Sequence, residues 1–89
     1  MVWANTGLAQ QGLGELDAAV ASYRKALWLN QGIHSDHGQA EVLDFLASAQ
    51  LEQGEPEQAR ASWTRAAELF GALRVARAAE MRVKAESVR

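Results

Sequence analysis

The chain has 89 residues, a hydrophobic fraction of 48% and a formal net charge of −2. This length allows one small domain, and such a chain buries a smaller share of its surface than a larger domain does. It has no cysteines, which excludes disulfides, thiolate metal sites and cysteine nucleophiles. A reducing compartment fits this composition, so the cytoplasm is the expected location. The sequence has no apolar run long enough to span a membrane and no leader peptide pattern.

The charge is divided unevenly along the chain. Residues 1–72 hold 9 acidic and 4 basic side chains, whereas residues 73–89 hold 2 acidic and 5 basic ones. These bases alternate with Glu80 and Glu86 and make only a thin basic patch. A solvated helix explains such a pattern better than nucleic-acid binding does, so nucleic acid is not an expected partner.

An internal repeat with a period of 40 residues organises the chain. Nine of the 27 positions from Trp3 to Leu29 are identical to the residue 40 positions later. The identities include a Gly-Glu pair at residues 14–15, which recurs at residues 54–55. The sequence therefore predicts two copies of one structural unit.

The first unit, at about residues 2–30, is predicted to consist of two antiparallel helices at residues 2–13 and 16–29. Gly14 ends the first helix, since glycine readily takes the left-handed conformation that a helix C-terminus often needs. The second helix has apolar residues at helical spacing, namely Ala19, Val20, Tyr23, Ala26 and Leu27.

A long polar loop is predicted at residues 31–38, and it would account for the length of the period. The second unit is predicted at residues 39–70. Gly54 ends its first helix, and Pro56 suits the first turn of the next helix, where its missing N–H costs nothing.

A last helix is predicted at residues 72–89, as a cap on the array. Its apolar residues fall into two stripes. One contains Ala72, Val75, Ala76, Ala79 and Val83, and the other contains Ala78, Met81, Ala85 and Val88. A cap needs only one apolar face, so the second stripe needs a partner. Trp28 raises the same question, because its counterpart in the second unit is the charged Glu68. We therefore predict self-association through a set of apolar residues that includes the unshielded Trp3: Trp3, Trp28, Met81, Ala85 and Val88.

These residues resemble the signature of the tetratricopeptide repeat family. The first unit offers Trp3, Gly7, Gly14, Ala19, Tyr23 and Ala26, and the second offers Leu43, Leu46, Ala47, Gly54, Ala59, Trp63 and Ala66. The resemblance covers about residues 2–70. Thr6 departs from it, since leucine is usual there. The period of 40 residues also exceeds the usual 34.

The resemblance implies an all-α fold. It would contain two antiparallel helix–turn–helix units and a C-terminal helix, in a short right-handed α-solenoid that forms a single domain over residues 1–89. Units with a long period are similar to those in bacterial STAND-type NTPase transcriptional regulators. In such proteins the array is an interaction region at one end of a larger chain.

The resemblance also implies a function in binding proteins rather than in catalysis. The first helix of each unit would line an inner groove, with Asn5, Leu8, Gln11, Glu41, Asp44, Ser48 and Leu51. Chaperone-binding members of the family use Lys, Arg and Asn there to clamp a terminal carboxylate. This groove has Asn5 but no Lys or Arg, so we expect a neutral or basic, partly apolar peptide instead. Two functions stay open: a module for a protein or peptide partner within a longer array, and a homo-oligomerisation unit with no other ligand.

No metal, cofactor or catalytic residue is expected. His34, Asp36 and His37 lie close together in the predicted loop, but a metal site needs three or four converging ligands and no fourth residue is fixed. Ser35 or Asp36 is explained more simply as a turn or helix-start residue. The sequence offers neither a nucleophile–base–orienter set nor a phosphate-binding Gly-Lys loop.

Overall fold

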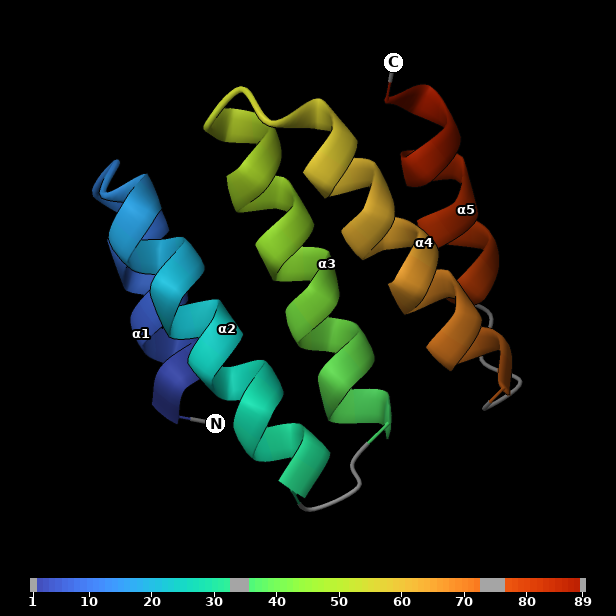
Figure 1. Cartoon of the computed structure of the whole chain (residues 1–89), viewed down its shortest axis with the longest axis horizontal. Coiled ribbons are helices and arrows are strands. Elements are labelled where there is room, and N and C mark those ends of the chain that lie inside the picture. Colours follow the sequence, from blue (N-terminus) through green and yellow to red (C-terminus); the bar gives the residue numbers. More distant parts are fainter. Residues whose placement is uncertain (1, 33–35, 73–76, 89) are drawn as a thin grey trace.

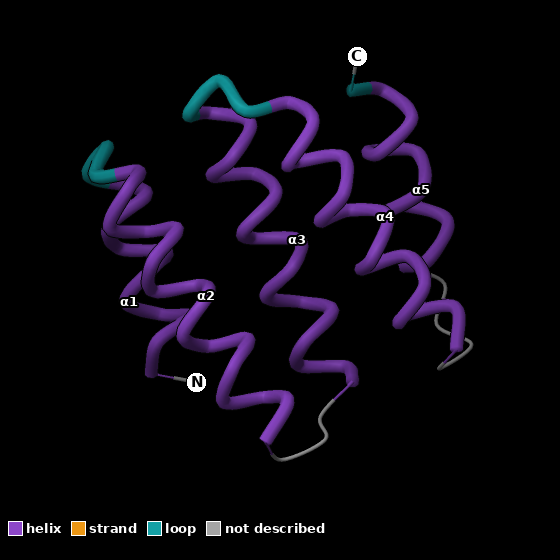
Figure 2. Tube along the Cα trace, viewed as in Figure 1, coloured by secondary structure: helices purple, strands orange, loops and turns teal. Residues whose placement is uncertain are grey.

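The structure is a computed structural model that describes residues 2–32, 36–72 and 77–88. These residues form five helices: α1 (Val2–Gly12), α2 (Leu16–Gly32), α3 (Asp36–Glu52), α4 (Pro56–Ala72) and α5 (Arg77–Ser87). Each helix packs against the one before it (Figure 1), so the described chain is a short α-solenoid. The described residues contain helices and turns without a strand (Figure 2), which confirms the predicted all-α class.

The two turns inside the units are copies of each other. Gly14 has φ 80° and Gly54 has φ 82°, the left-handed conformation that was predicted. The amide of Glu15 donates to the carbonyl oxygen of Gln10 at 2.9 Å, and the amide of Glu55 donates to that of Gln50 at 2.9 Å. These bonds form the Schellman motif, which satisfies the last carbonyls of a helix. Both turns lie at the same end of the molecule (Figure 1), with the two helices of each unit antiparallel.

A side-chain hydrogen bond between the two helices of a unit is also duplicated. Ser22 Oγ donates to Gln10 Oε1 at 2.6 Å, and Ser62 Oγ donates to Gln50 Oε1 at 2.7 Å. Each bond joins the two helices of one unit. It gives a physical reason for the identities at these positions, because a buried polar side chain without its partner would be costly.

The connection between the units is shorter than predicted. α2 continues to Gly32 and α3 begins at Asp36, so the predicted loop at residues 31–38 is wrong at both ends, while residues 33–35 lie outside the described residues. The extra length of the period is largely helical, since α2 and α3 have 17 residues each. The lengthened helices include Gly32 at the end of α2 and Gly38 near the start of α3. A glycine inside a helix costs only about 1 kcal/mol, and the packing of the helices outweighs that cost. The first turns of α3 are anchored by buried Ala40 and by the His37 ring, 5.7 Å from the Phe70 ring.

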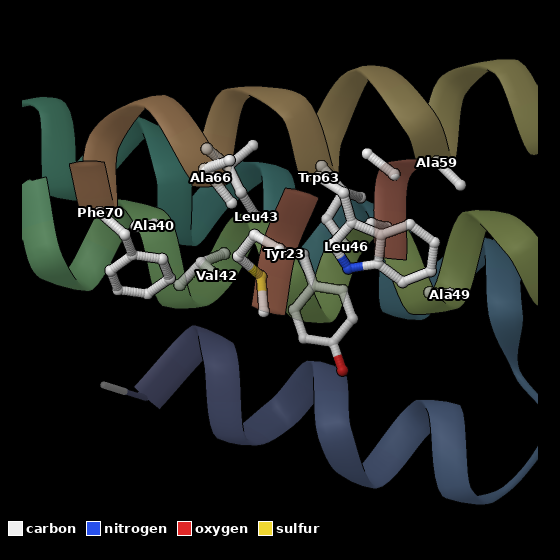
Figure 3. Packing of buried hydrophobic residues seen from close by; sticks show 14 of the residues in the cluster. Tyr23, Ala40, Val42, Leu43, Leu46, Ala49, Ala59, Trp63, Ala66 and Phe70 are labelled. Carbon is white, nitrogen blue, oxygen red and sulfur yellow. The ribbon is translucent and has the colours of Figure 1, made fainter. Parts of the chain in front are cut away.

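The core consists of large side chains set among alanines (Figure 3). Tyr23 and Trp63 are both buried, at equivalent positions of the two units. Around them lie the fully or almost fully buried alanines of the repeat: Ala19, Ala26, Ala59 and Ala66. Small residues beside large ones let the helices interlock at close range.

The last helix packs through the stripe that was predicted to be free. The Met81 side chain is 0% exposed, and Ala85 and Val88 are buried with it. The prediction that these three residues form a self-association surface is therefore wrong. Val83, on the other stripe, is 65% exposed. The rotation of α5 is fixed by polar contacts as well, because Arg60 of α4 donates through Nε and a terminal nitrogen to the Val88 carbonyl oxygen.

Gly7 marks a close approach of α1 to the core. A Cβ added at Gly7 would lie 2.5 Å from Cε1 of the buried Tyr23 ring. Alanine gains about 1 kcal/mol in helix propensity, but overpacking a core costs about 1–3 kcal/mol. We expect Gly7→Ala to lower the free energy of unfolding in urea by about 1–2 kcal/mol. Gly12→Ala is the matched control in the same helix, since nothing lies within 4 Å of its Cβ position. Equal stability of the two variants would contradict this close approach.

Candidate functional site

Two of the predicted groove residues meet where α1 contacts α3. Gln11 Nε2 donates to Ser48 Oγ at 3.3 Å and to Glu52 Oε1 at 3.0 Å. The hydroxyl of Tyr23 donates to Gln11 Oε1 at 2.8 Å, and its side chain points from the core toward α1 (Figure 3). The Gln11 amide is thus fixed by α2 and α3 together.

Exposed apolar residues lie one turn away from this contact. Leu8 is one turn before Gln11 and is 42% exposed, while Leu51 is one turn after Ser48 and is 43% exposed. Asn5, one turn before Leu8, is exposed as well. We call the set Asn5, Leu8, Gln11, Ser48 and Leu51 the inner face. It combines an ordered amide with accessible leucines.

Asp44 does not belong to this accessible set, so the prediction is wrong for this residue. Its side chain is buried, and two residues occupy its Oδ1 oxygen: Trp63 Nε1 donates to it at 2.8 Å and Lys84 Nζ at 2.9 Å. Glu41 stands apart too, since it lies at the other end of α3 and faces His37 Nδ1 at 3.7 Å. The sequence placed all these acids in one groove because helical spacing alone cannot distinguish a solvated carboxylate from a buried one.

Lys84 is the residue that sequence reasoning missed. Its ammonium group brings a positive charge from α5 to the α3 side of the molecule, where no Lys or Arg was expected. The repeat does contain a sequence signal for this residue, because Lys84 lies one period of 40 residues after Asp44 and so takes the equivalent position in the last helix. That signal is weak, because the last helix shares few identities with the units before it. Lys84 is engaged by Asp44 and by Glu80, 3.7 Å away, so it does not restore a clamp for a terminal carboxylate.

The two tryptophans of the first unit differ in accessibility. Trp28 is 71% exposed. This exposure agrees with the charged residue, Glu68, that takes the equivalent position in the second unit. Trp3 is half-buried against the core, and Lys25 Nζ lies 4.5 Å from its ring centroid, within range of a cation–π contact. Of the five residues predicted for self-association, Trp28 is therefore the one that solvent reaches most freely.

The buried Tyr23 gives the fold a pH dependence. Burial, with a smaller effect from the charge of Glu52, raises the pKa of Tyr23 from 10.0 to about 12. The neutral phenol is the form favoured by folding, so its stabilisation is complete below about pH 10 and is lost as the pH rises through about 12.

Because Tyr23 is the chain's single tyrosine, phenolate absorbance measures it directly. We expect a titration midpoint near pH 12, accompanied by a loss of stability from pH 10 upward, and we expect Tyr23→Phe to remove the absorbance change. Ionisation at about pH 10 with helical circular dichroism intact would contradict the buried position.

The described residues form neither a cluster of metal ligands nor a helix that could span a membrane. No three His, Cys, Asp or Glu side chains in that part of the chain come together as a metal site. His34 and the side chain of Asp36 lie outside it; α3 does begin at Asp36, as predicted for a helix-start residue. None of the described helices combines the length and the apolar character needed to cross a membrane.

Comparison with known protein families gives one match. The sequence profile of the tetratricopeptide repeat matches residues 2–32, the span of α1, its glycine turn and α2. Comparisons with curated proteins and with solved structures found no significant match. The helix–turn–helix geometry of this segment agrees with the profile. The chain therefore carries a tetratricopeptide repeat, formed by α1 and α2.

Proposed function

We propose that the chain is a protein-interaction module that binds a peptide or a protein segment on its inner face. Tetratricopeptide repeats generally mediate interactions between proteins, and such arrays use the extended surfaces that their stacking creates. The module acts by binding and not by catalysis, as is typical of the family.

The observation that carries this proposal is the order of the Gln11 amide. It is held by Tyr23, Ser48 and Glu52, so a ligand that bonds to it does not have to immobilise it. Such pre-organisation reduces the entropic cost of binding. Leu8 and Leu51 supply apolar area beside it.

Charge narrows the choice of ligand. Glu52 is exposed and bonds directly to Gln11, whereas the positive charge of Lys84 is paired with Asp44 and Glu80. A basic or neutral peptide with apolar side chains fits this surface better than an acidic one.

Peptide display tests the proposal. Peptides selected on the immobilised chain would be synthesised and their dissociation constants measured by calorimetry. We expect Leu51→Lys and Leu8→Lys each to weaken binding about tenfold or more, the effect of losing a central apolar contact. Val83→Lys is the control, since Val83 is an exposed apolar residue of α5. Peptides that bind Leu51→Lys as tightly as the parent chain would refute the inner face as their site.

We further propose a setting for the module. We place it in the cytoplasm, because a cysteine-free composition suits a reducing compartment. We also propose that the chain works as part of a longer array. The similarity to STAND-type regulators stays a prediction.

A further inference from the structure

The outer side of α2 carries charges that are separated along the helix. Asp17, Ala21, Arg24 and Trp28 follow one another at intervals of one turn and are all exposed; we call them the α2 stripe. Within residues 2–32 the charged side chains are Glu15, Asp17, Arg24 and Lys25. The acids lie at the N-terminal end of α2, beside the glycine turn, and the bases lie at the middle of that helix.

The two ends of the α2 stripe present different groups to solvent. Among the described residues no acid pairs with Arg24, and Trp28 is 71% exposed. At the turn end Leu13 is 76% exposed. Beside it lies a shallow hollow of about 520 Å³, lined by Gly14, Asp17 and Gln53 among others. One end thus presents a cation and an indole, and the other presents an acid, an exposed leucine and a hollow.

We propose that two copies of the chain pair through the α2 stripe, with their α2 helices antiparallel about a two-fold axis near Ala21. In this arrangement Asp17 of each copy faces Arg24 of the other. Trp28, four residues beyond Arg24, then reaches past the first turn of the other copy's α2 toward the turn at residues 13–15 that precedes it. The opposite charges match in this register, and the exposed Trp28 comes close to the turn that carries the exposed Leu13.

A two-fold interface requires a surface that is complementary to itself, and the stripe meets this requirement. Its acid and its base lie on either side of a small residue, Ala21, which lets two helix backbones approach closely. Antiparallel helices also bring opposite ends of their dipoles together. The partner that this surface fits best is therefore a second copy of the same chain.

The pairing is separate from the inner face. The inner face is formed by α1 and α3, whereas the stripe belongs to α2. The pairing uses none of the residues of the inner face, so this inference does not rest on the peptide-binding proposal.

Sedimentation equilibrium from micromolar to millimolar concentration tests the pairing. The parent chain is expected to be a dimer in the upper part of this range. Trp28→Ala and Arg24→Glu are each expected to raise the dimer dissociation constant about tenfold or more, as is usual for a central interface residue. The Arg24 side chain makes no hydrogen bond, ion pair or ring contact within the described chain, so its replacement removes no such contact from the fold. Val83→Ala, on α5, is the control and is expected to leave the constant unchanged.

A charge swap decides whether the contact is Asp17 with Arg24. The double variant Asp17→Lys with Arg24→Glu restores opposite charges across the two-fold axis, and its dissociation constant should return to within about threefold of the parent value. Asp17 also accepts a bond from Gln53 Nε2 at 2.7 Å, so helical circular dichroism is recorded to confirm that the variant is folded. A folded double variant that fails to regain the dimer overturns the register. A parent chain that stays monomeric throughout overturns the pairing.

Discussion

Asp44→Ala is expected to lower the free energy of unfolding by about 2–4 kcal/mol. The change removes the acceptor of the buried Trp63 indole N–H and also the partner of Lys84. A buried donor left unsatisfied costs about 1–3 kcal/mol, and the lost ion pair adds less, because the Lys84 side chain is 36% exposed and screened by solvent. Urea unfolding followed by tryptophan fluorescence gives the value.

Two further variants separate the contributions at Asp44. Asp44→Asn keeps an oxygen for the Trp63 N–H and loses the charge, so we expect it to lower the free energy of unfolding by about 1 kcal/mol. Lys84→Met removes the ammonium group and keeps the packing of its stem, and it should cost a similar amount. If Lys84→Met proves as costly as Asp44→Ala, the hydrogen bond to Trp63 is not the larger part and the explanation fails.

Met81→Ala is expected to cost about 2–4 kcal/mol, the usual range for emptying a buried site. Met81 is fully buried in the contact of α5 with the rest of the core. Val83→Ala, two residues away on the exposed stripe, should change stability by less than about 0.5 kcal/mol. Thermal or urea unfolding of the pair reports which stripe faces inward. A larger loss for Val83→Ala would mean that α5 is rotated relative to the structure described above.

The turns and the helix pairs were predictable because single residues determine them. Gly14 and Gly54 take a conformation that other residues adopt only at a cost, and both stand at the end of an apolar pattern. The duplicated spacing of alanines and aromatic residues then predicted which faces are buried. These signals are local, so one sequence is enough to find them.

The rotation of α5 was not predictable in this way. Its two stripes are similarly apolar, and the helical period cannot choose between them. The choice depends on polar contacts that span the sequence, from Lys84 to Asp44 and from Arg60 to the Val88 carbonyl. The contact between Lys84 and Asp44 also helps to bury Asp44. The packing of α5 therefore accounts for two wrong predictions: that Asp44 lines the groove, and that Met81, Ala85 and Val88 form a self-association surface.

The inner face was predictable in outline only. Its leucines and Asn5 are exposed as expected, but the order of Gln11 arises from three residues on two other helices. The paired bonds of Ser22 and Ser62 were equally hidden, although the matching sequence positions were visible. Side-chain hydrogen bonds between helices leave little trace in a hydrophobic pattern.

The packing of each helix mainly on its neighbours in the chain has a kinetic consequence. Contacts between nearby elements close short loops, which favours rapid folding. α3 is covered on both sides, by α2 and α4, whereas α1 and α5 each have one principal neighbour. In a linear array of this kind the middle is the last part to open. Amide hydrogens should therefore exchange slowest in α3 and progressively faster toward both ends, with the molecule unfolding from its edges inward.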